Sequence, residues 1–188
     1  MSTIIAAGLG TLTASNTATI VDPQTPANGI ARLSPLVSFA PVTASGTSVD
    51  FVGIPSWARR IIVVFNGISM ASTSSPLLQL GSGSVTTSGY LAYASYAGSG
   101  TGGVTYSNGF GTSMGNAAAL MYGEFYFTLS TGNTWVHSHI TAVNASGTYY
   151  MMNGGGNIAL PGVLDRVRIT SSNGTDTFDT GTLTCYYH

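Results

Sequence analysis

A His-Ser-His triplet is the part of the sequence whose residue types could bind a metal. His137 and His139 flank Ser138 in a run that begins with Trp135 and Val136. Such a run favours a β-strand, and alternation along a strand places both imidazoles on one face with Cβ atoms roughly 6–7 Å apart. Facing a threefold axis, three pairs would supply six nitrogens, an octahedral site suited to iron or nickel. The alternative is two half-exposed residues bonded to water or to a neighbouring loop.

An aromatic set in the middle of the chain is the best candidate for binding a ligand. Its members are Tyr90, Tyr93, Tyr96, Tyr106, Asn108 and Phe110. Aromatic faces stack on sugar rings and amides bind sugar hydroxyls, so the set is suited to a glycan. Tyrosine also fills interfaces between subunits, and we favour interface packing over glycan contact.

Motifs for catalysis do not stand out in the sequence. Gly81-Ser-Gly-Ser resembles a nucleophile elbow only loosely, and a turn is the better interpretation. Glu124 is the only glutamate, so no pair of carboxylates is specified for glycosidase chemistry. The glycine-rich stretch 98–111 lacks the lysine and helix of a phosphate loop, and predicts a long loop or a loose sheet edge. We predict a protein that is not an enzyme and has no cofactor.

Short strands are the elements that would position these residues. From residue 46 onward, β-branched and aromatic runs alternate with Gly, Ser and Asn, and Asn-Gly pairs at 66–67, 108–109, 153–154 and 173–174 predict turns or bulges. The pattern predicts an all-β fold, an antiparallel β-sandwich of jelly-roll type over residues 46–188. The strands are expected at 48–52, 60–68, 77–80, 90–96, 120–129, 134–143, 148–152, 157–160, 165–170 and 181–187.

Residues 1–45 have a different composition. They are rich in Ala, Thr and Ser, and Pro23, Pro26, Pro35 and Pro41 interrupt any regular element. Apolar side chains nevertheless punctuate the segment more often than in a solvated linker. We predict an extended N-terminal arm that anchors the chain to a partner.

The charge composition sets limits on the partners. Charged residues are 6% of the chain, there is no lysine, and the formal net charge is −1. This excludes the basic patch of a nucleic-acid-binding protein, and no apolar run is long enough for membrane insertion. A surface so poor in charge predicts permanent self-assembly, as does the run 61–65, which is apolar on both faces; we expect a homotrimer. The single Cys185 is expected in the core, and Asp165 is expected either to pair with Arg59, Arg60 or Arg168 or to be an exposed rim charge.

Two segments of the chain carry family motifs. The first is Phe51-Val-Gly-Ile-Pro-Ser-Trp-Ala-Arg-Arg-Ile-Ile-Val-Val-Phe-Asn-Gly-Ile-Ser, and the second is Leu164-Asp-Arg-Val-Arg-Ile-Thr-Ser-Ser-Asn-Gly-Thr-Asp-Thr-Phe-Asp-Thr-Gly-Thr-Leu-Thr. Together they resemble the opening and the end of a C-terminal module common in tailed-phage and prophage fibre and virion proteins. The resemblance covers about residues 46–188 and implies a virion component without catalytic residues. The module normally ends a longer polypeptide, whereas here it follows a short arm.

These observations predict a non-enzymatic structural protein on the exterior of a tailed-phage virion. We expect a trimeric module of a fibre tip or of receptor-binding type, attached to other virion proteins through residues 1–45, with a host-surface glycan as a candidate partner. One alternative is a capsid decoration (cement) protein that stabilises the head. Another is a secreted carbohydrate-binding module.

Overall fold

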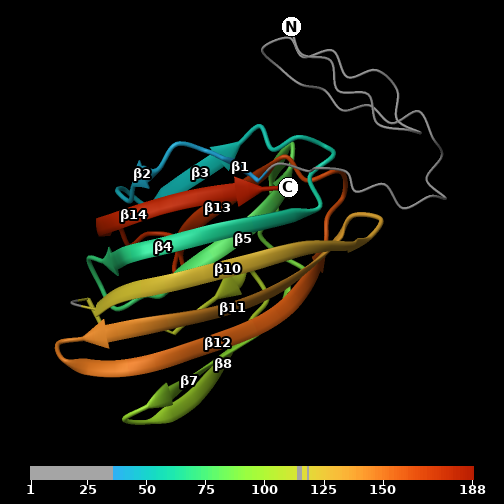
Figure 1. Cartoon of the computed structure of the whole chain (residues 1–188). Helices are drawn as coiled ribbons and strands as arrows, with labels where there is room; N and C mark the ends of the chain where they lie inside the picture. Colours follow the sequence, from blue (N-terminus) through green and yellow to red (C-terminus); the bar gives the residue numbers. More distant parts are fainter. Residues whose placement is uncertain (1–35, 114–115, 118) are drawn as a thin grey trace, which may run out of the picture. The chain divides into compact units, whose positions relative to one another are not determined.

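The folded unit spans Leu36–His188 and consists of two antiparallel β-sheets packed face to face. The structure is a computed structural model, and it describes residues 36–113, 116–117 and 119–188. The all-β sandwich predicted from the sequence is confirmed (Figure 1). No helix in the part of the chain that the structure describes could cross a membrane.

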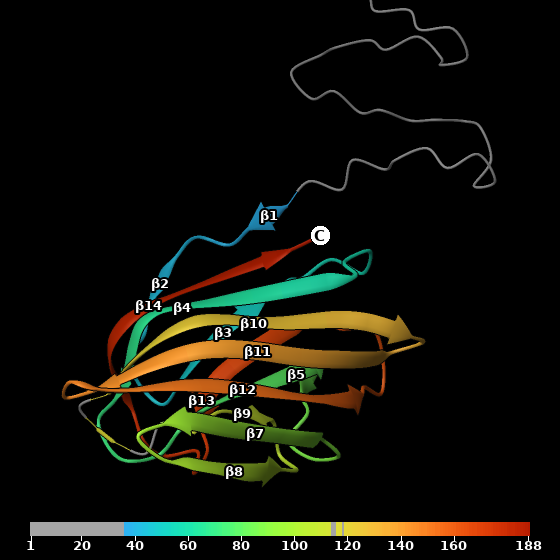
Figure 2. The ribbon, with the colours of Figure 1, turned by 60° about the horizontal axis from the view of Figure 1, so that its bottom comes forward.

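The large sheet has nine strands, and most of them lie side by side in Figure 2. Its strand order is β1 (Val37–Ser38), β14 (Phe178–Tyr187), β4 (Arg60–Met70), β10 (Ala119–Thr131), β11 (Thr134–Ala145), β12 (Thr148–Ala159), β7 (Leu91–Gly98) and β8 (Thr101–Tyr106), and β2 (Val42–Thr43) also pairs with β14.

The small sheet has five strands and covers one face of the large sheet (Figure 2). Its order is β3 (Ser48–Val52), β13 (Arg166–Ser171), β5 (Pro76–Ser82) and β6 (Ser84–Val85), and β9 (Phe110–Gly111) pairs with β5. A simple jelly roll has eight strands. The jelly-roll subtype therefore stays a prediction.

The core lies between the two sheets, and β4 shows how the sequence forms it. Ile61, Val63 and Phe65 point inward and are buried, while Ile62 and Val64 lie on the opposite face and are half-buried. The strand is apolar on both faces, as the sequence predicted. Burying such side chains is the main source of the sandwich's stability.

Cys185, on β14, is buried in the same core as the sequence predicted. Burial raises the pKa of its thiol to about 12, because the charged thiolate would lie in an apolar environment. The thiol is therefore protonated at neutral pH and behaves as a small apolar side chain.

The boundary of the folded unit differs from the predicted one. The sequence predicts that residues 36–45 belong to the arm, but β1 and β2 fall within them and pair with β14, adding backbone hydrogen bonds to the edge of the large sheet. The compact unit begins at Leu36 instead of residue 46. The remainder of the predicted arm, residues 1–35, lies outside the described residues.

The Asn-Gly pairs form different structures. Gly174 has a φ of 75° in the turn between β13 and β14, and Gly67 has a φ of 67° at an irregularity between β4 and β10, as the pairs predicted. Asn153-Gly154 does not form a turn: it lies inside β12, which runs unbroken where two strands were expected. The stretch 98–111 contains β8 at the edge of the large sheet, followed by β9.

Candidate functional site

β11 alternates between a polar inward side and a more apolar outward side. Its inward side includes His137, His139 and Thr141, each at most 3% exposed, between the buried ends Trp135 and Val143. Its outward side carries Val136 and Ile140, which is 65% exposed. The strand thus places polar groups in the core and apolar groups at the surface, the reverse of an ordinary amphipathic strand.

The two histidines form a chain of hydrogen bonds. The backbone oxygen of Tyr126 lies 3.2 Å from Nδ1 of His137, and Nε2 of His137 lies 3.0 Å from Nδ1 of His139. A carbonyl only accepts, so Nδ1 of His137 carries the proton that it donates to Tyr126. Nε2 of neutral His137 is then an acceptor, and Nδ1 of His139 must donate to it. The chain fixes both tautomers and leaves Nε2 of His139 with a bare lone pair.

Burial keeps both histidines neutral. It lowers the pKa of His137 to about 3, with a further lowering from His139 that outweighs the opposing effect of the Tyr126 carbonyl. Burial alone lowers the pKa of His139 to about 4. Neither imidazole is charged at neutral pH, which agrees with the single-proton tautomers required by the hydrogen-bond chain.

Aromatic rings enclose the histidines from both sheets. His137 stacks on Phe127 of β10 with centroids 4.9 Å apart, and Phe110 of β9 lies 4.5 Å from it. His139 stacks on Phe125 at 4.6 Å. On the other side, Gly154 lies opposite His139, and a Cβ at Gly154 would overlap the imidazole. The glycine is therefore needed for space within a strand.

The predicted metal site around a threefold axis does not fit this arrangement. His137 and His139 do share one face, as alternation predicted, but that face is the interior of one chain, where copies of the pair cannot meet. Each imidazole also uses a nitrogen to bind the other. In the residues that the structure describes, no three His, Cys, Asp or Glu side chains come together to hold a metal.

Two buried polar atoms near this pair have no hydrogen-bond partner in the structure. They are Nε2 of His139 and Oγ1 of Thr141, two positions further along the same inward side. An unpaired buried polar atom destabilises a folded protein by roughly 1–3 kcal/mol. This row is therefore less stabilising than an apolar row of the same shape would be.

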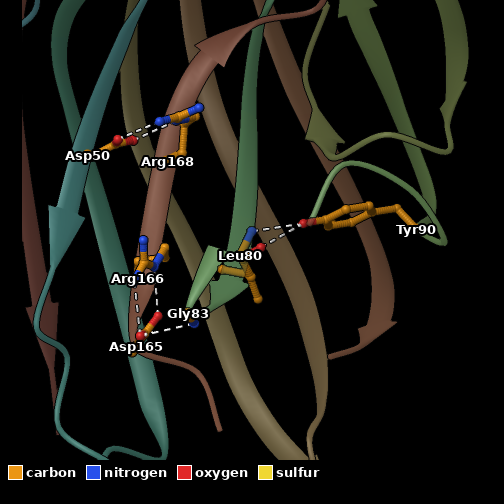
Figure 3. A network of polar contacts seen from close by, with 7 residues as sticks. All are labelled: Asp50, Leu80, Gly83, Tyr90, Asp165, Arg166 and Arg168. Atoms are coloured by element: carbon orange, nitrogen blue, oxygen red, sulfur yellow. Dashed lines mark hydrogen bonds and ion pairs between the residues drawn. The ribbon is translucent and has the colours of Figure 1, made fainter. Parts of the chain in front are cut away.

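The six residues of the predicted aromatic site are not brought together on one surface. Tyr90 and Phe110 are buried in the core with their rings 4.9 Å apart, and the Tyr90 hydroxyl bonds Leu80 (Figure 3). Tyr106 is half-buried and its hydroxyl donates to Thr112. The others are Tyr96, which packs against the core, Asn108, which is half-buried, and Tyr93, which is exposed.

Burial explains why these residues divide in this way. Tyr90 and Phe110 fill the space between the sheets, so they stabilise the fold and offer no surface to a ligand. Burial also raises the pKa of Tyr90 to about 12. Tyr93 alone, 53% exposed, keeps a ring available for contact.

The outward side of the large sheet carries a set of exposed residues, of which the sequence indicated only Tyr93 as a candidate for binding. We call this surface the tyrosine face. It is formed by β7, β10, β11 and β12, and its exposed apolar and aromatic members are Leu91, Tyr93, Tyr122, Tyr126, Val136, Ile140, Tyr149 and Met151. Exposed apolar groups concentrated on one face mark a contact surface. The alternation of residue types within 134–143 was the sequence signal that could have identified this face. Alternation alone does not show which side of a strand faces the core.

A shallow groove lies within the tyrosine face. Glu124, Tyr126, Ser138 and Ile140 line it, with Val64 at its side. The Tyr126 hydroxyl donates to the Glu124 carboxylate, and this hydrogen bond is the main cause of the raised pKa of Tyr126. Glu124 is the one Asp, Glu, Arg or Lys residue among the outward residues of the four strands.

The outward side of the small sheet has a different chemistry, as Figure 3 shows. Arg168 of β13 forms a two-pronged ion pair with Asp50 of β3, at 2.6 and 2.7 Å. Asp165 pairs with its neighbour Arg166 at 2.8 Å and accepts from the backbone of Gly83. The expected pairing of Asp165 with Arg59, Arg60 or Arg168 is thus wrong, because Arg168 faces Asp50 across the β3–β13 register.

Comparison with known proteins does not assign the chain to a family. No family model, no curated protein and no solved structure matches the chain. The resemblance to the phage virion module therefore depends on the two sequence segments alone.

Proposed function

We propose that the chain is a non-enzymatic structural protein on the outside of a tailed-phage virion. In this proposal it acts as a trimeric module of a fibre tip or of receptor-binding type, attached to other virion proteins through residues 1–35, the part of the predicted arm that precedes the sandwich. The tyrosine face is the observation that carries the proposal. A rigid sheet that presents tyrosine and aliphatic side chains on a nearly uncharged surface is suited to lasting contact with another molecule.

Two further observations support this function. The 51–69 and 164–184 segments resemble those of a virion module, and in this fold they provide β13 and most of β4 and β14. Exposed apolar residues also lie outside the tyrosine face, among them Leu36, Trp57 and Val163, and are available for contacts between copies. Few charges would oppose such contacts.

Immunogold labelling of particles tests the location. Antibodies raised against the purified chain are applied to particles from the strain whose genome encodes it, and label at the tail tip is the expected result. Label on the head would replace the fibre-tip proposal with the decoration alternative. Protein recovered from the culture fluid with unlabelled particles would contradict a virion role and favour the secreted alternative.

Sedimentation equilibrium tests the trimer. The expected mass is three times the 19.2 kDa of one chain at micromolar concentration. A stable monomer under these conditions would contradict it.

Two truncations test the anchoring role of the arm. Removing residues 1–35 leaves β1 and β2 in place, so the sandwich should fold normally but fail to join particles. Removing 1–44 also deletes both strands, and a lower unfolding midpoint is expected. Incorporation of the shorter deletion into particles would show that the anchor lies elsewhere.

A further inference from the structure

The tyrosine face contains a row of four positions across four strands, with a large residue at each end and two small residues between them. Tyr126 of β10 lies opposite Ser138, Ser138 opposite Gly155, and Gly155 opposite Tyr93. Two exposed tyrosines thus stand on either side of a floor with little side-chain volume. Three strand spacings separate them, on the order of 14 Å.

The ring of Tyr93 lies against the neighbouring strand β8. A Cβ at Gly103 would overlap its hydroxyl, so only glycine at that position allows this placement of the ring. Tyr93 remains 53% exposed. An aromatic ring held against the sheet in this way is a preorganised stacking surface, and binding to it requires little further ordering.

Polar groups surround the row, and nearly all of them are neutral. Ser138, Asn153 and Asn157 supply hydroxyl and amide groups on the same outward side. Glu124 is held in place by the Tyr126 hydroxyl and still has acceptor positions on its carboxylate. Aromatic rings together with amides, hydroxyls and one carboxylate match a ligand that has apolar ring faces and many hydroxyl donors.

The charge of the face decides among the classes of ligand. The outward residues of β7, β10, β11 and β12 include no arginine, and Arg60 of the adjacent β4, whose charge acts on Tyr126, is a single cation at the edge of the row. Nucleic acids and anionic lipids therefore find no cluster of positive charge there. A second copy docked through the same four strands would bury Glu124 against outward residues that carry no cation, with Arg60 only at the β4 edge, which is unfavourable for a carboxylate. Hydroxyl donors would satisfy Glu124 without a cation.

We propose that the groove and the row from Tyr126 to Tyr93 form a binding site for a neutral, hydroxyl-rich glycan chain. Sugar rings stack on the two tyrosines, and Glu124 accepts hydrogen bonds from sugar hydroxyls. The inference deepens the proposed receptor-binding function by naming the chemical class of the receptor.

Binding to the purified full-length chain tests the site. The probes are maltohexaose, cellohexaose, chitohexaose and the neutral surface polysaccharide of the strain that encodes the chain, with a heparin hexasaccharide as the anionic counterpart. Saturation-transfer NMR detects binding and calorimetry measures affinity. At least one neutral probe is expected to bind, and heparin is not.

Variants locate the site. Tyr126→Ala and Glu124→Gln should each weaken binding at least about tenfold, the loss expected when a stacking ring or a charged hydrogen-bond acceptor is removed. Arg168→Ala, on the outward side of the small sheet, is the matched control and should bind as the natural chain does. Glu124→Gln preserves the side-chain shape, so it tests the proposal even if Tyr126→Ala folds poorly.

Several results would overturn the proposal. They are failure of every neutral probe, equal binding of heparin, or unchanged affinity in Glu124→Gln. Dimerisation that Tyr126→Ala abolishes would assign the face to a second copy instead. Each of these results leaves the particle-labelling experiment unaffected, so failure of the glycan site is distinguishable from failure of the virion proposal.

Discussion

Two strands of the sandwich, β13 and β11, alternate between inward and outward residues with opposite chemistry. In β13 the inward Val167 and Ile169 are fully buried, and the outward Arg166 and Arg168 form ion pairs. In β11 the inward side includes a histidine pair and a threonine, and Ile140 is 65% exposed on the outward side. β13 is the ordinary amphipathic strand of a sandwich, whereas the middle of β11 carries its polar groups inward, between the buried Trp135 and Val143.

This difference distinguishes residues that stabilise the fold from residues that are available to a partner. The side chains of β13 satisfy the usual requirements of folding: apolar groups are buried and charges are solvated. The inward polar groups of β11 require a hydrogen-bond chain and a glycine in the neighbouring strand, and its outward apolar groups bury little area in this chain. The outward apolar groups of β11 are therefore available to a partner, which is the kind of surface that the proposed function requires.

Lowering the pH should produce the largest change in stability, because it protonates the two histidines on the inward side of β11. Unfolded histidine binds a proton near pH 6.5, whereas folded His139 and His137 do so only near 4 and 3. Between these values the unfolded state binds more protons, so stability falls as the pH falls from about 6.5. Each histidine lowers the free energy of unfolding by about 1.4 kcal/mol per pH unit in this window. Urea unfolding at pH 7 and pH 5 measures the loss.

The control for the pH experiment is a double variant that lacks both imidazoles. In His137→Leu/His139→Leu the stability should vary much less between pH 7 and 5, because neither titrating group remains. At pH 7 the double variant should be at least as stable as the natural chain, since paired polar groups are replaced by apolar ones of similar size. Equal stability of the natural chain at pH 7 and 5 would show that the pair titrates normally.

The same substitution in the two strands should have different effects. Ile169→Ala removes buried methyl groups and should lower the free energy of unfolding by about 2–5 kcal/mol. Ile140→Ala changes an exposed side chain and should lower it by less than about 1 kcal/mol. Denaturant unfolding of both variants measures the comparison. Similar losses would indicate that Ile140 is buried in an assembly under the conditions used.

Gly154→Ala tests the space that the histidines require. The added methyl overlaps His139, and a loss of about 1–3 kcal/mol is expected. Gly155→Ala is the neighbouring control: its methyl points to the opposite side of β12, and a smaller change is expected. In a His139→Ala background the penalty of Gly154→Ala should become smaller without vanishing, because the added methyl would still lie 2.8 Å from the backbone oxygen of Tyr93, and a double-mutant cycle measures the decrease. An unchanged penalty would place its origin in the contact with the Tyr93 backbone.

The ion pair of β13 should give the smallest effect. Asp50→Asn removes an interaction between side chains that are each 36% exposed, and a loss of at most about 1 kcal/mol is expected. The loss should vanish in 1 M NaCl, because salt screens exposed charges. A large loss that is independent of salt would mean that this pair determines the β3–β13 register.

The sequence predicted the strands better than it predicted their environment. β3 was predicted at its observed bounds, and β4 and β11 with their observed first residues. These predictions succeeded because β-branched and aromatic runs have few alternatives to a strand. β1 and β2 were missed because each has only two residues next to proline-broken sequence and becomes a strand through its pairing with the distant β14.

Two features depended on contacts between distant residues and could not be read locally. Asn153-Gly154 has the sequence of a turn, but His139 on the adjacent strand requires glycine inside β12. Alternation placed His137 and His139 on one side of a strand, but a period of two is the same whichever side faces the core. For the same reason, the sequence indicated tyrosines as binding residues without separating buried Tyr90 from exposed Tyr93.

The buried Cys185 gives this protein a built-in reporter. It is the chain's only cysteine, its side chain is inaccessible, and its thiol is protonated in the folded state. A maleimide dye should therefore react with it only in molecules whose large sheet has opened at β14. The rate of dye attachment then measures how often that sheet opens under native conditions, and no engineered label is needed.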